Sequence, residues 1–212
     1  MTRPSVGELQ KALEVHRWVD LPALPGKRND RLAAVLVPLV WDEGFRCVLT
    51  ERSAHLREHP RQICFPGGRP EPEDKNLADT ALREAFEEAG TFREAQVLGR
   101  LSSVPLLTSE YRLVPYVADV SGSSFVPNPD EVAEILLLEL EPLIAEATTL
   151  AIPWDRAGER RLAPIFKVGS RFVFGGTAYA LYELLAILRR MRRLDAPKMI
   201  ESGYEWSEVV PR

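Results

Sequence analysis

The sequence predicts an α/β fold built on a mixed sheet with helices on its faces. Its 212 residues, 45% hydrophobic and 27% charged, suit one well-cored soluble domain. Residues 32–40 are nearly all apolar, as expected of a strand that is buried on both faces. Amphipathic helices at 76–90 and 177–191 alternate irregularly with the strands, which favours a mixed sheet over a regular parallel one.

The first third of the chain is predicted to contain a helix, a β-hairpin and a long loop. In order, these are a helix at 5–19 with Ser5 as its N-cap, a connector at 21–30, hairpin strands at 32–40 and 45–50, and a loop or short strands at 51–72. The last of these segments is polar and contains prolines. Long loops in compact domains are usually functional, so this one is a candidate site.

The remaining elements follow from periodicity and turn residues. The helix at 76–90 is apolar along one side and ends at Gly90. After it we expect strands at 95–105, 111–120 and 132–138, a short helix at 142–149, a strand pair at 165–174 and a helix at 177–191.

Charge and cysteine content exclude several classes of protein. A formal net charge of −4 argues against general nucleic-acid binding, whereas a phosphorylated small substrate remains compatible because a metal ion supplies positive charge locally. Cys47 and Cys64 both stand in apolar contexts, so we expect reduced, buried thiols. The N-terminus lacks the apolar core of a signal peptide, and no apolar run reaches the ~20 residues of a membrane span. We therefore expect a cytoplasmic protein that binds no membrane.

Three glutamates share one face of the helix at 76–90. Glu84, Glu87 and Glu88 are i, i+3 and i+4 neighbours, and like charges at this spacing cost roughly 0.2–0.5 kcal/mol per pair. The helix gains nothing from this arrangement unless a cation binds there, and hard divalent cations favour carboxylate oxygens. The alternative is a solvated acidic face.

Two nearby features favour the metal site over the solvated face. The Gly67–Gly68 pair lets backbone groups approach a metal or phosphate without an intervening Cβ. Arg83 directly precedes Glu84. The segment from Gly68 to Gly90 resembles the Nudix box: a glycine, a spaced acidic residue, Arg-Glu, two residues, Glu-Glu and a further glycine. The residues that match it are Arg83, Glu84, Glu87, Glu88 and Gly90.

The segment departs from the general Nudix box at three points. Asp74 stands where the box has glutamate, the loop is one residue longer, and Thr91 replaces an aliphatic residue. The first two departures are typical of one subgroup of the family. We do not expect the third to affect the chemistry.

The resemblance implies an α/β/α sandwich that uses Mg²⁺ or Mn²⁺ to hydrolyse a nucleoside diphosphate linked to another group. Carried over residue by residue, Glu84 and Glu88 are the principal metal ligands, with the Gly68 backbone beside them. Glu87 is a further ligand or the base that deprotonates water, and Arg83 holds a glutamate by a charge-assisted bond. The implied organisation is an N-terminal helix and connector at 1–30, a Nudix hydrolase domain at 31–193 and a C-terminal tail at 194–212.

Five segments are similar to the coenzyme A pyrophosphatase subgroup. They are residues 49–53 and 56–68 ahead of the box, and 128–132, 174–178 and 181–185 after it. Arg61 departs from this subgroup, which usually has glycine at that position. The resemblance implies hydrolysis of coenzyme A or its thioesters to 3′,5′-ADP and 4′-phosphopantetheine or its acyl form.

A cluster of cations gives a physical argument for the same substrate. Coenzyme A carries a 3′-phosphate besides its diphosphate, and arginine binds phosphate bidentately. The candidate substrate-binding residues are Arg52, Arg57, His59, Arg61 and Arg69, together with Gly67 and Gly68. The alternative is a solvated basic loop that balances the acidic helix.

The sequence leaves two alternative functions open, and it does not decide the roles of several single residues. One rival is hydrolysis of another nucleoside diphosphate derivative, such as ADP-ribose or a dinucleotide; the other is a non-catalytic Nudix-fold nucleotide-binding or sensing module. Glu131 is a strand-end residue or a distant base candidate. Tyr179 is interpreted as a core or rim residue rather than a substrate platform. The oligomeric state is not fixed by the sequence, and a homodimer is one alternative.

Overall fold

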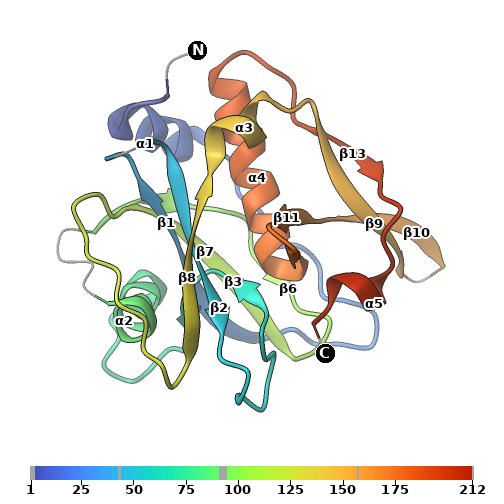
Figure 1. The fold of residues 1–212 in the computed structure, drawn as a ribbon, viewed down its shortest axis with the longest axis horizontal. Helices are drawn as coiled ribbons and strands as arrows, with labels where there is room; N and C mark the ends of the chain where they lie inside the picture. Colours follow the sequence, from blue (N-terminus) through green and yellow to red (C-terminus); the bar gives the residue numbers. More distant parts are fainter. Residues whose placement is uncertain (1–2, 43, 91–94, 157, 212) are drawn as a thin grey trace.

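A mixed sheet lies at the centre of the structure, a computed structural model that describes residues 3–42, 44–90, 95–156 and 158–211 (Figure 1). Its strand order is β3-β2-β1-β7-β5, with β4 paired to β1, β6 to β7 and β8 to β2. The strands are β1 (Arg31–Val40), β2 (Arg46–Arg52), β3 (Ile63–Cys64), β4 (Gly67–Gly68), β5 (Gln96–Arg100), β6 (Val104–Pro105), β7 (Tyr111–Asp119) and β8 (Val132–Glu139). The β1–β2 pair is antiparallel and the β1–β7 pair is parallel, which confirms the predicted mixed sheet.

The remaining elements are helices and two small sheets. The helices are α1 (Val6–Val15), α2 (Leu77–Ala89), α3 (Leu140–Ala145), α4 (Gly175–Met191) and α5 (Trp206–Val209). One small sheet has the order β10-β9-β13, and the other is the β11–β12 hairpin. Their strands are β9 (Thr148–Arg156), β10 (Glu159–Pro164), β11 (Phe166–Val168), β12 (Arg171–Val173) and β13 (Lys198–Glu201).

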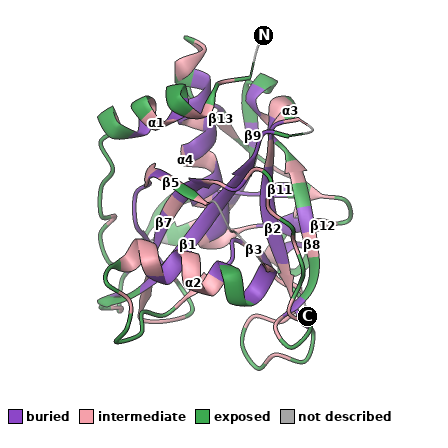
Figure 2. Cartoon of the chain, turned by 90° about the vertical axis from the view of Figure 1, so that its left-hand side faces the viewer, coloured by how far each residue is buried: buried purple, intermediate pink, exposed green. Residues whose placement is uncertain are grey.

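Strand β1 is buried on both faces because a helical layer covers each side of the sheet. Successive side chains of a strand point to opposite faces. Ala34 and Leu36 pack in one cluster with Ala81 and Ala85 of α2. These small helix residues let α2 lie close to the sheet, and Figure 2 shows the central strands in the buried colour.

The opposite face of β1 packs against the other helices. Val35 and Val37 belong to a second cluster that includes Leu9 of α1 and Leu181 and Leu184 of α4. The two clusters lie on either side of one sheet and so give the expected α/β/α arrangement (Figure 1). In the part of the chain that the structure describes, no helix is long and apolar enough to cross a membrane.

Local signals set the ends of the predicted helices. Ser5 accepts a hydrogen bond from the Glu8 N–H and donates its own backbone N–H to the Glu8 carboxylate, which confirms it as the N-cap of α1. The helix ends at Val15, earlier than expected, because His16 has extended backbone. In α2, Asn76 caps the start and Gly90 follows the last turn.

The expected helix at 142–149 was wrong in its second half. Helix α3 ends at Ala145, and the residues from Thr148 onward form strand β9. This strand pairs with β10 and, in parallel, with β13, where Leu150 lies opposite Ile200. The partner β13 is distant in sequence, so local patterns do not predict this sheet. The C-terminal segment is therefore packed, and Val209 of α5 is buried.

The burial pattern of β1 predicts unequal effects for two leucines on the same strand. Leu36 is fully buried, whereas Leu32 is 41% exposed. We expect Leu36→Ala to lower the free energy of unfolding by about 2–5 kcal/mol, because it leaves a cavity between α2 and the sheet. Leu32→Ala is the matched control and changes it by less than about 1 kcal/mol. Equal losses in denaturant unfolding would contradict this packing.

Candidate active site

The two residues of β4 form a short strand at the side of β1 and also contact helix α2. Gly67 pairs with Val35 and Gly68 with Ala34 of β1. A Cβ at Gly67, where φ is +154°, would lie 2.3 Å from the Ala34 carbonyl oxygen. A Cβ at Gly68 would lie 2.5 Å from the carboxyl carbon and both oxygens of Glu84. The Glu84 carboxylate therefore rests on the Gly68 backbone, and only glycine leaves room for it.

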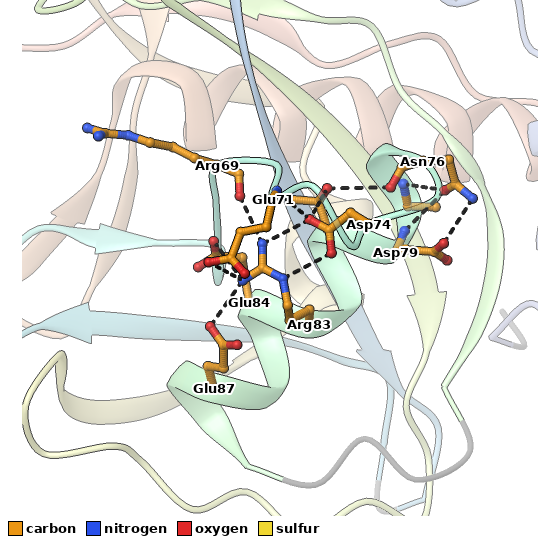
Figure 3. A network of polar contacts seen from close by, with 10 residues as sticks. Arg69, Glu71, Asp74, Asn76, Asp79, Arg83, Glu84 and Glu87 are labelled. Carbon is orange, nitrogen blue, oxygen red and sulfur yellow. Dashed lines mark hydrogen bonds and ion pairs between the residues drawn. The ribbon is translucent and has the colours of Figure 1, made fainter.

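Arg83 is the centre of a network that joins this loop to the helix (Figure 3). Its guanidinium donates to Asp74 twice, Nε to Oδ1 and Nη2 to Oδ2, each at 3.0 Å. Nη2 also donates to the Arg69 carbonyl at 2.9 Å. Nη1 lies 3.2 Å from both Glu84 Oε1 and Glu87 Oε2. The expected contacts to glutamate are present, and Asp74 is the principal partner of Arg83.

Asp74 holds the loop before the helix in place. Its Oδ2 accepts hydrogen bonds from the Thr80 hydroxyl and from the Glu71 N–H, both at 2.9 Å. The hydrogen bonds from Arg83, followed by the one from Glu71, keep the pKa of Asp74 well below its usual range. This shorter acidic residue, a departure from the general Nudix box, therefore remains charged and fixes the Arg83 side chain.

Glu88 is a buried carboxylate with incomplete pairing. Its side chain is 4% exposed, and its Oε1 lies 4.0 Å from Arg52 Nη1. Its Oε2 has no hydrogen-bond partner among the described residues. Burial raises the pKa of Glu88 to about 8, and the neighbouring carboxylates of Glu131 and Glu84 add to the rise while Arg52 opposes it. When it ionises, a buried carboxylate of this kind calls for a further cation.

Glu84 lies beside Glu88, whereas Glu87 is held apart from them. Burial also raises the pKa of Glu84, with Arg83 opposing the rise and Glu87 and Glu131 adding to it. Glu87 is 49% exposed and is drawn toward Arg83. Within the described residues, no three Asp, Glu, His or Cys side chains converge into a complete metal site. The structure brings Glu84 and Glu88 together beside the β4 backbone, with Glu131 nearby. The role of Glu87 as a metal ligand or base stays a prediction.

The five candidate cations do not form one cluster. Arg52, at the end of β2, is the cation next to Glu88. Arg57 and Arg61 are exposed on the connection between β2 and β3. His59 and Arg61 both have left-handed backbone, with φ of 56° and 59°. Arg61 thus retains the conformation that glycine, usual here in the coenzyme A subgroup, adopts most easily.

Arg69 is directed away from the carboxylates (Figure 3). Its guanidinium lies 4.8 Å above the Tyr111 ring and 3.8 Å from Glu58. A side chain in this position does not reach the Glu84–Glu88 pair without a change of rotamer. The prediction that Arg69 contacts substrate therefore has less geometric support than the one for Arg52.

The sequence did not indicate the contacts of Arg171. This residue of β12 forms ion pairs with Glu51 and with Glu134, the latter at 2.8 Å. They tie the β11–β12 hairpin to β2 beside the register shift at Glu51 and Arg52. Glu51 and Arg171 are 120 residues apart in the sequence, so local sequence patterns do not predict this ion pair.

The two cysteines are free thiols. Cys47 is buried, and Cys64 is partly buried next to the Thr50 hydroxyl. Burial raises the pKa of the Cys64 thiol to about 11, and Glu88 adds to the rise. A thiol with such a pKa is a poor nucleophile, which is consistent with a packing role for Cys64. Thr91, the remaining departure in the helix segment, lies outside the described residues.

Comparison with known proteins identifies the family. The NUDIX domain matches residues 30–157. The chain is 35% identical over 165 residues to an uncharacterized Nudix hydrolase NudL of Pectobacterium atrosepticum, covering 77% of this chain and 85% of the relative. It is 36% identical over 143 residues to Nudix hydrolase 3 of Caenorhabditis elegans, covering 60% of this chain and 59% of the relative. The chain belongs to the Nudix family and is a Nudix hydrolase.

Solved structures agree with the fold. A NUDIX hydrolase from Nitrosomonas europaea superposes with a TM-score of 0.51 at 14% identity, covering 82% of this chain and 80% of that one. A NUDIX hydrolase from Alicyclobacillus acidocaldarius superposes with a TM-score of 0.50 at 16% identity, covering 78% of this chain and 97% of that one. At such low identity these matches support the mixed α/β architecture alone.

The two glycines of β4 are predicted to differ in what an added methyl group disrupts. Gly67→Ala should destabilise the fold by about 1–3 kcal/mol, since the Cβ meets backbone and φ is unfavourable. Gly68→Ala should instead displace the Glu84 carboxylate and lower kcat/KM by about tenfold or more, with a smaller loss of stability. Thermal unfolding and diphosphate hydrolysis of both variants would test this. Full activity of folded Gly68→Ala would contradict the placement of Glu84.

Proposed function

We propose that this Nudix hydrolase cleaves the diphosphate bond of coenzyme A or an acyl-coenzyme A. The products are 3′,5′-ADP and 4′-phosphopantetheine or its acyl form. The observation that carries the catalytic part is a pair of carboxylates beside the Gly67–Gly68 backbone: Glu84 is partly buried, and Glu88 is buried with one oxygen unpartnered among the described residues. The substrate assignment is supported by the sequence similarity of residues 49–68 and by the cations on the same connection.

The residues at β4 fit a divalent cation. The oxygen donors here are the unpartnered buried oxygen of Glu88, the adjacent Glu84 carboxylate and the backbone carbonyl of Gly68. Because Gly68 has no Cβ, its backbone is accessible beside Glu84. Carboxylate and carbonyl oxygens are the donors that Mg²⁺ and Mn²⁺ prefer. Glu84, Glu88 and the Gly68 backbone would hold the ion, and Glu87 would join them on leaving Arg83. Such an ion would neutralise charge on the phosphoryl oxygens and make a bound water more acidic.

Arginine side chains would position the metal ligands and bind the substrate. Arg83, fixed by Asp74, keeps Glu84 against Gly68, so the pair is in place before substrate arrives. Arg52 adds positive charge next to Glu88. Arg57 and Arg61 extend from the preceding loop, where their exposed guanidinium groups suit the 3′-phosphate of the adenosine end.

Neutral replacement of either Glu84 or Glu88 is predicted to abolish most turnover. Glu84→Gln and Glu88→Gln should each lower kcat by about a hundredfold or more, because a charged oxygen donor is lost where phosphoryl charge develops. Glu73→Gln, an exposed position ahead of the helix, is the matched control and should retain activity. Full activity of both buried-site variants would contradict the assignment of α2.

The basic loop is tested by comparing two substrates that differ by one phosphate. Replacing Arg57 and Arg61 together by Ala should raise KM for coenzyme A far more than for 3′-dephospho-coenzyme A. Each lost charge-assisted contact corresponds to about 1.5–3 kcal/mol. Arg160→Ala, an exposed arginine that pairs with Glu201, is the control. An equal rise for both substrates would show that the loop does not grip the 3′-phosphate.

Substrate panels and product masses test the function as a whole. With Mg²⁺ or Mn²⁺, coenzyme A or its thioesters should give the highest kcat/KM in a panel containing ADP-ribose and dinucleotides. A higher value for either competitor would favour the rival nucleoside diphosphate function.

Isotope labelling identifies the bond. Water attacks one phosphorus in line, and the other phosphate leaves as a stable anion. Hydrolysis in ¹⁸O-water should therefore label only one of the two products and leave an acyl chain on the pantetheine. Inorganic phosphate or free carboxylic acid as the main product would contradict the mechanism.

A further inference from the structure

The β10-β9-β13 sheet has two edge strands, and the chain protects them unequally. Strand β10 forms one edge and β13 the other, with β9 between them. The first residues of β10, 159–161, are all charged, and the Tyr179 hydroxyl donates to the Leu162 carbonyl at 3.2 Å. Charged side chains and covered backbone groups are common means of preventing an edge strand from pairing with another chain. The β10 edge is therefore protected.

Strand β13 leaves its outer edge open. It consists of residues 198–201, and all but Met199 are exposed. The N–H groups of Lys198 and Ser202 donate to carbonyls on the β9 side, at 2.9 and 2.8 Å. Backbone groups of alternate residues point to opposite sides of a strand, so those of Met199 and Glu201 point outward. Among the described residues, none forms a hydrogen bond with these outward groups.

An apolar pair lies beside this open edge. Ile200 is opposite Leu150 of β9, and the two residues are 38% and 36% exposed. Paired residues of neighbouring strands point to the same face of a sheet, so the two side chains are adjacent. Single exposed apolar residues are common on protein surfaces, whereas an apolar pair beside an unpaired strand edge is suited to contact with another strand.

A second copy of β13 is complementary to this edge in one antiparallel register. A two-fold axis makes such a pairing identical for both copies, and directly opposed residues then point to the same face. We place Ile200 opposite Ile200 of the second copy. The outward N–H and C=O of Met199 then face the C=O and N–H of Glu201 in the other copy, and the reverse. Every outward backbone group of β13 thereby gains a partner.

The neighbouring registers are less favourable. With Met199 opposite itself, Glu201 faces Pro197 of the second copy, and proline has no N–H to donate. With Glu201 opposite itself, two like charges face each other directly, which destabilises a strand pair. The sequence around β13 therefore selects the register that is centred on Ile200.

The charges at the edge are compatible with this register. Lys198 lies opposite Ser202 of the second copy, so no two lysines are opposed. Arg160 donates to both carboxylate oxygens of Glu201, at 2.6 and 2.7 Å, which compensates the charge of Glu201 within each copy. The apolar pairs of the two copies meet at Ile200 and form one row across the two sheets.

We propose that β13 is a homodimer interface, in which two copies pair their β13 strands antiparallel with Ile200 opposite Ile200. The pairing joins the two three-stranded sheets into one. Strand β13 lies far from α2 (Figure 1), so each copy keeps its own glutamates and the inference is independent of the proposed function. So short an interface buries less than the roughly 1,200 Å² of a standard one, and the dimer should have a Kd in the micromolar range.

Sedimentation equilibrium of the full chain tests the dimer. The wild type should change from monomer to dimer between about 1 and 200 µM. Ile200→Lys opposes two cations at an exposed position, and Met199→Pro removes an outward N–H while the bonds to β9 remain. Each should raise the Kd about tenfold or more. Leu137→Lys, at a 43% exposed position of β8 in the central sheet, is the matched control and should dimerise like the wild type.

Cysteine cross-linking tests the register. In an antiparallel pair that is not hydrogen-bonded, opposed Cα atoms are about 4.5 Å apart, a separation that a disulfide spans. Ile200→Cys should therefore give a disulfide-linked dimer under mild oxidation. Lys198→Cys, on the same face of the same strand, is the control, because the two copies of this position lie roughly 14 Å apart along the strand. It should remain monomeric on a non-reducing gel.

Each result either supports or overturns the interface. A wild type that is monomeric at every concentration overturns it, as does a dimer that persists in both Ile200→Lys and Met199→Pro. Equal cross-linking of Ile200→Cys and Lys198→Cys overturns the register. Loss of the dimer in Leu137→Lys alone assigns the contact to the central sheet instead. Diphosphate hydrolysis per subunit should be unchanged in Ile200→Lys, so the interface and the proposed function are tested separately.

Discussion

The two hydrogen bonds from Arg83 to Asp74 hold the rest of the candidate site in place. They join the loop after β4 to the middle of α2, and the same guanidinium lies against Glu84 and Glu87. Arg83 thereby offsets part of the repulsion among like charges on one helix face. It does not reach Glu88, whose nearest cation is Arg52 at 4.0 Å. The fold thus retains one buried carboxylate that is only partly compensated.

The packing of the sheet explains how this arrangement is maintained. Ala81 and Ala85 bring α2 close to β1, and the glycines of β4, which pair with β1, leave room for the Glu84 carboxylate. The glutamates consequently lie on a rigid two-layer support rather than on a loop, which favours a preorganised site. Strand β10 and helix α4, which lie outside the Nudix domain match, form a separate pocket together with Trp154 of β9 and leave the α2 site intact.

Local signals predicted the elements that depend on neighbouring residues. The Ser5 cap, the end of α2 at Gly90 and the uniformly apolar β1 all follow from short-range chemistry, as does the proximity of Glu84 and Glu88 at i and i+4. The sequence-based predictions were wrong or missing where an element or contact depends on residues far apart in the sequence. One of the two partners of strand β9, the parallel strand β13, lies far along the chain, and Pro153 weakens the strand pattern. The stacking of Arg69 on Tyr111 likewise depends on tertiary contacts, which is why one basic cluster was expected instead of a divided one.

The central claim is that α2 keeps Glu88 buried and partly uncompensated because a divalent cation binds there. Thermal unfolding with and without Mn²⁺ tests it most directly, since a ligand that binds the native state raises Tm. Mn²⁺ should raise Tm of the wild type and of Glu73→Gln by several degrees. Without the ion, and at a pH above 8 where Glu88 is ionised, Glu88→Gln should unfold at a higher temperature than the wild type, because repulsion is relieved, and Mn²⁺ should add little. A wild type that is insensitive to Mn²⁺, or a Glu88→Gln variant that is still stabilised by it to the same degree, would contradict the claim.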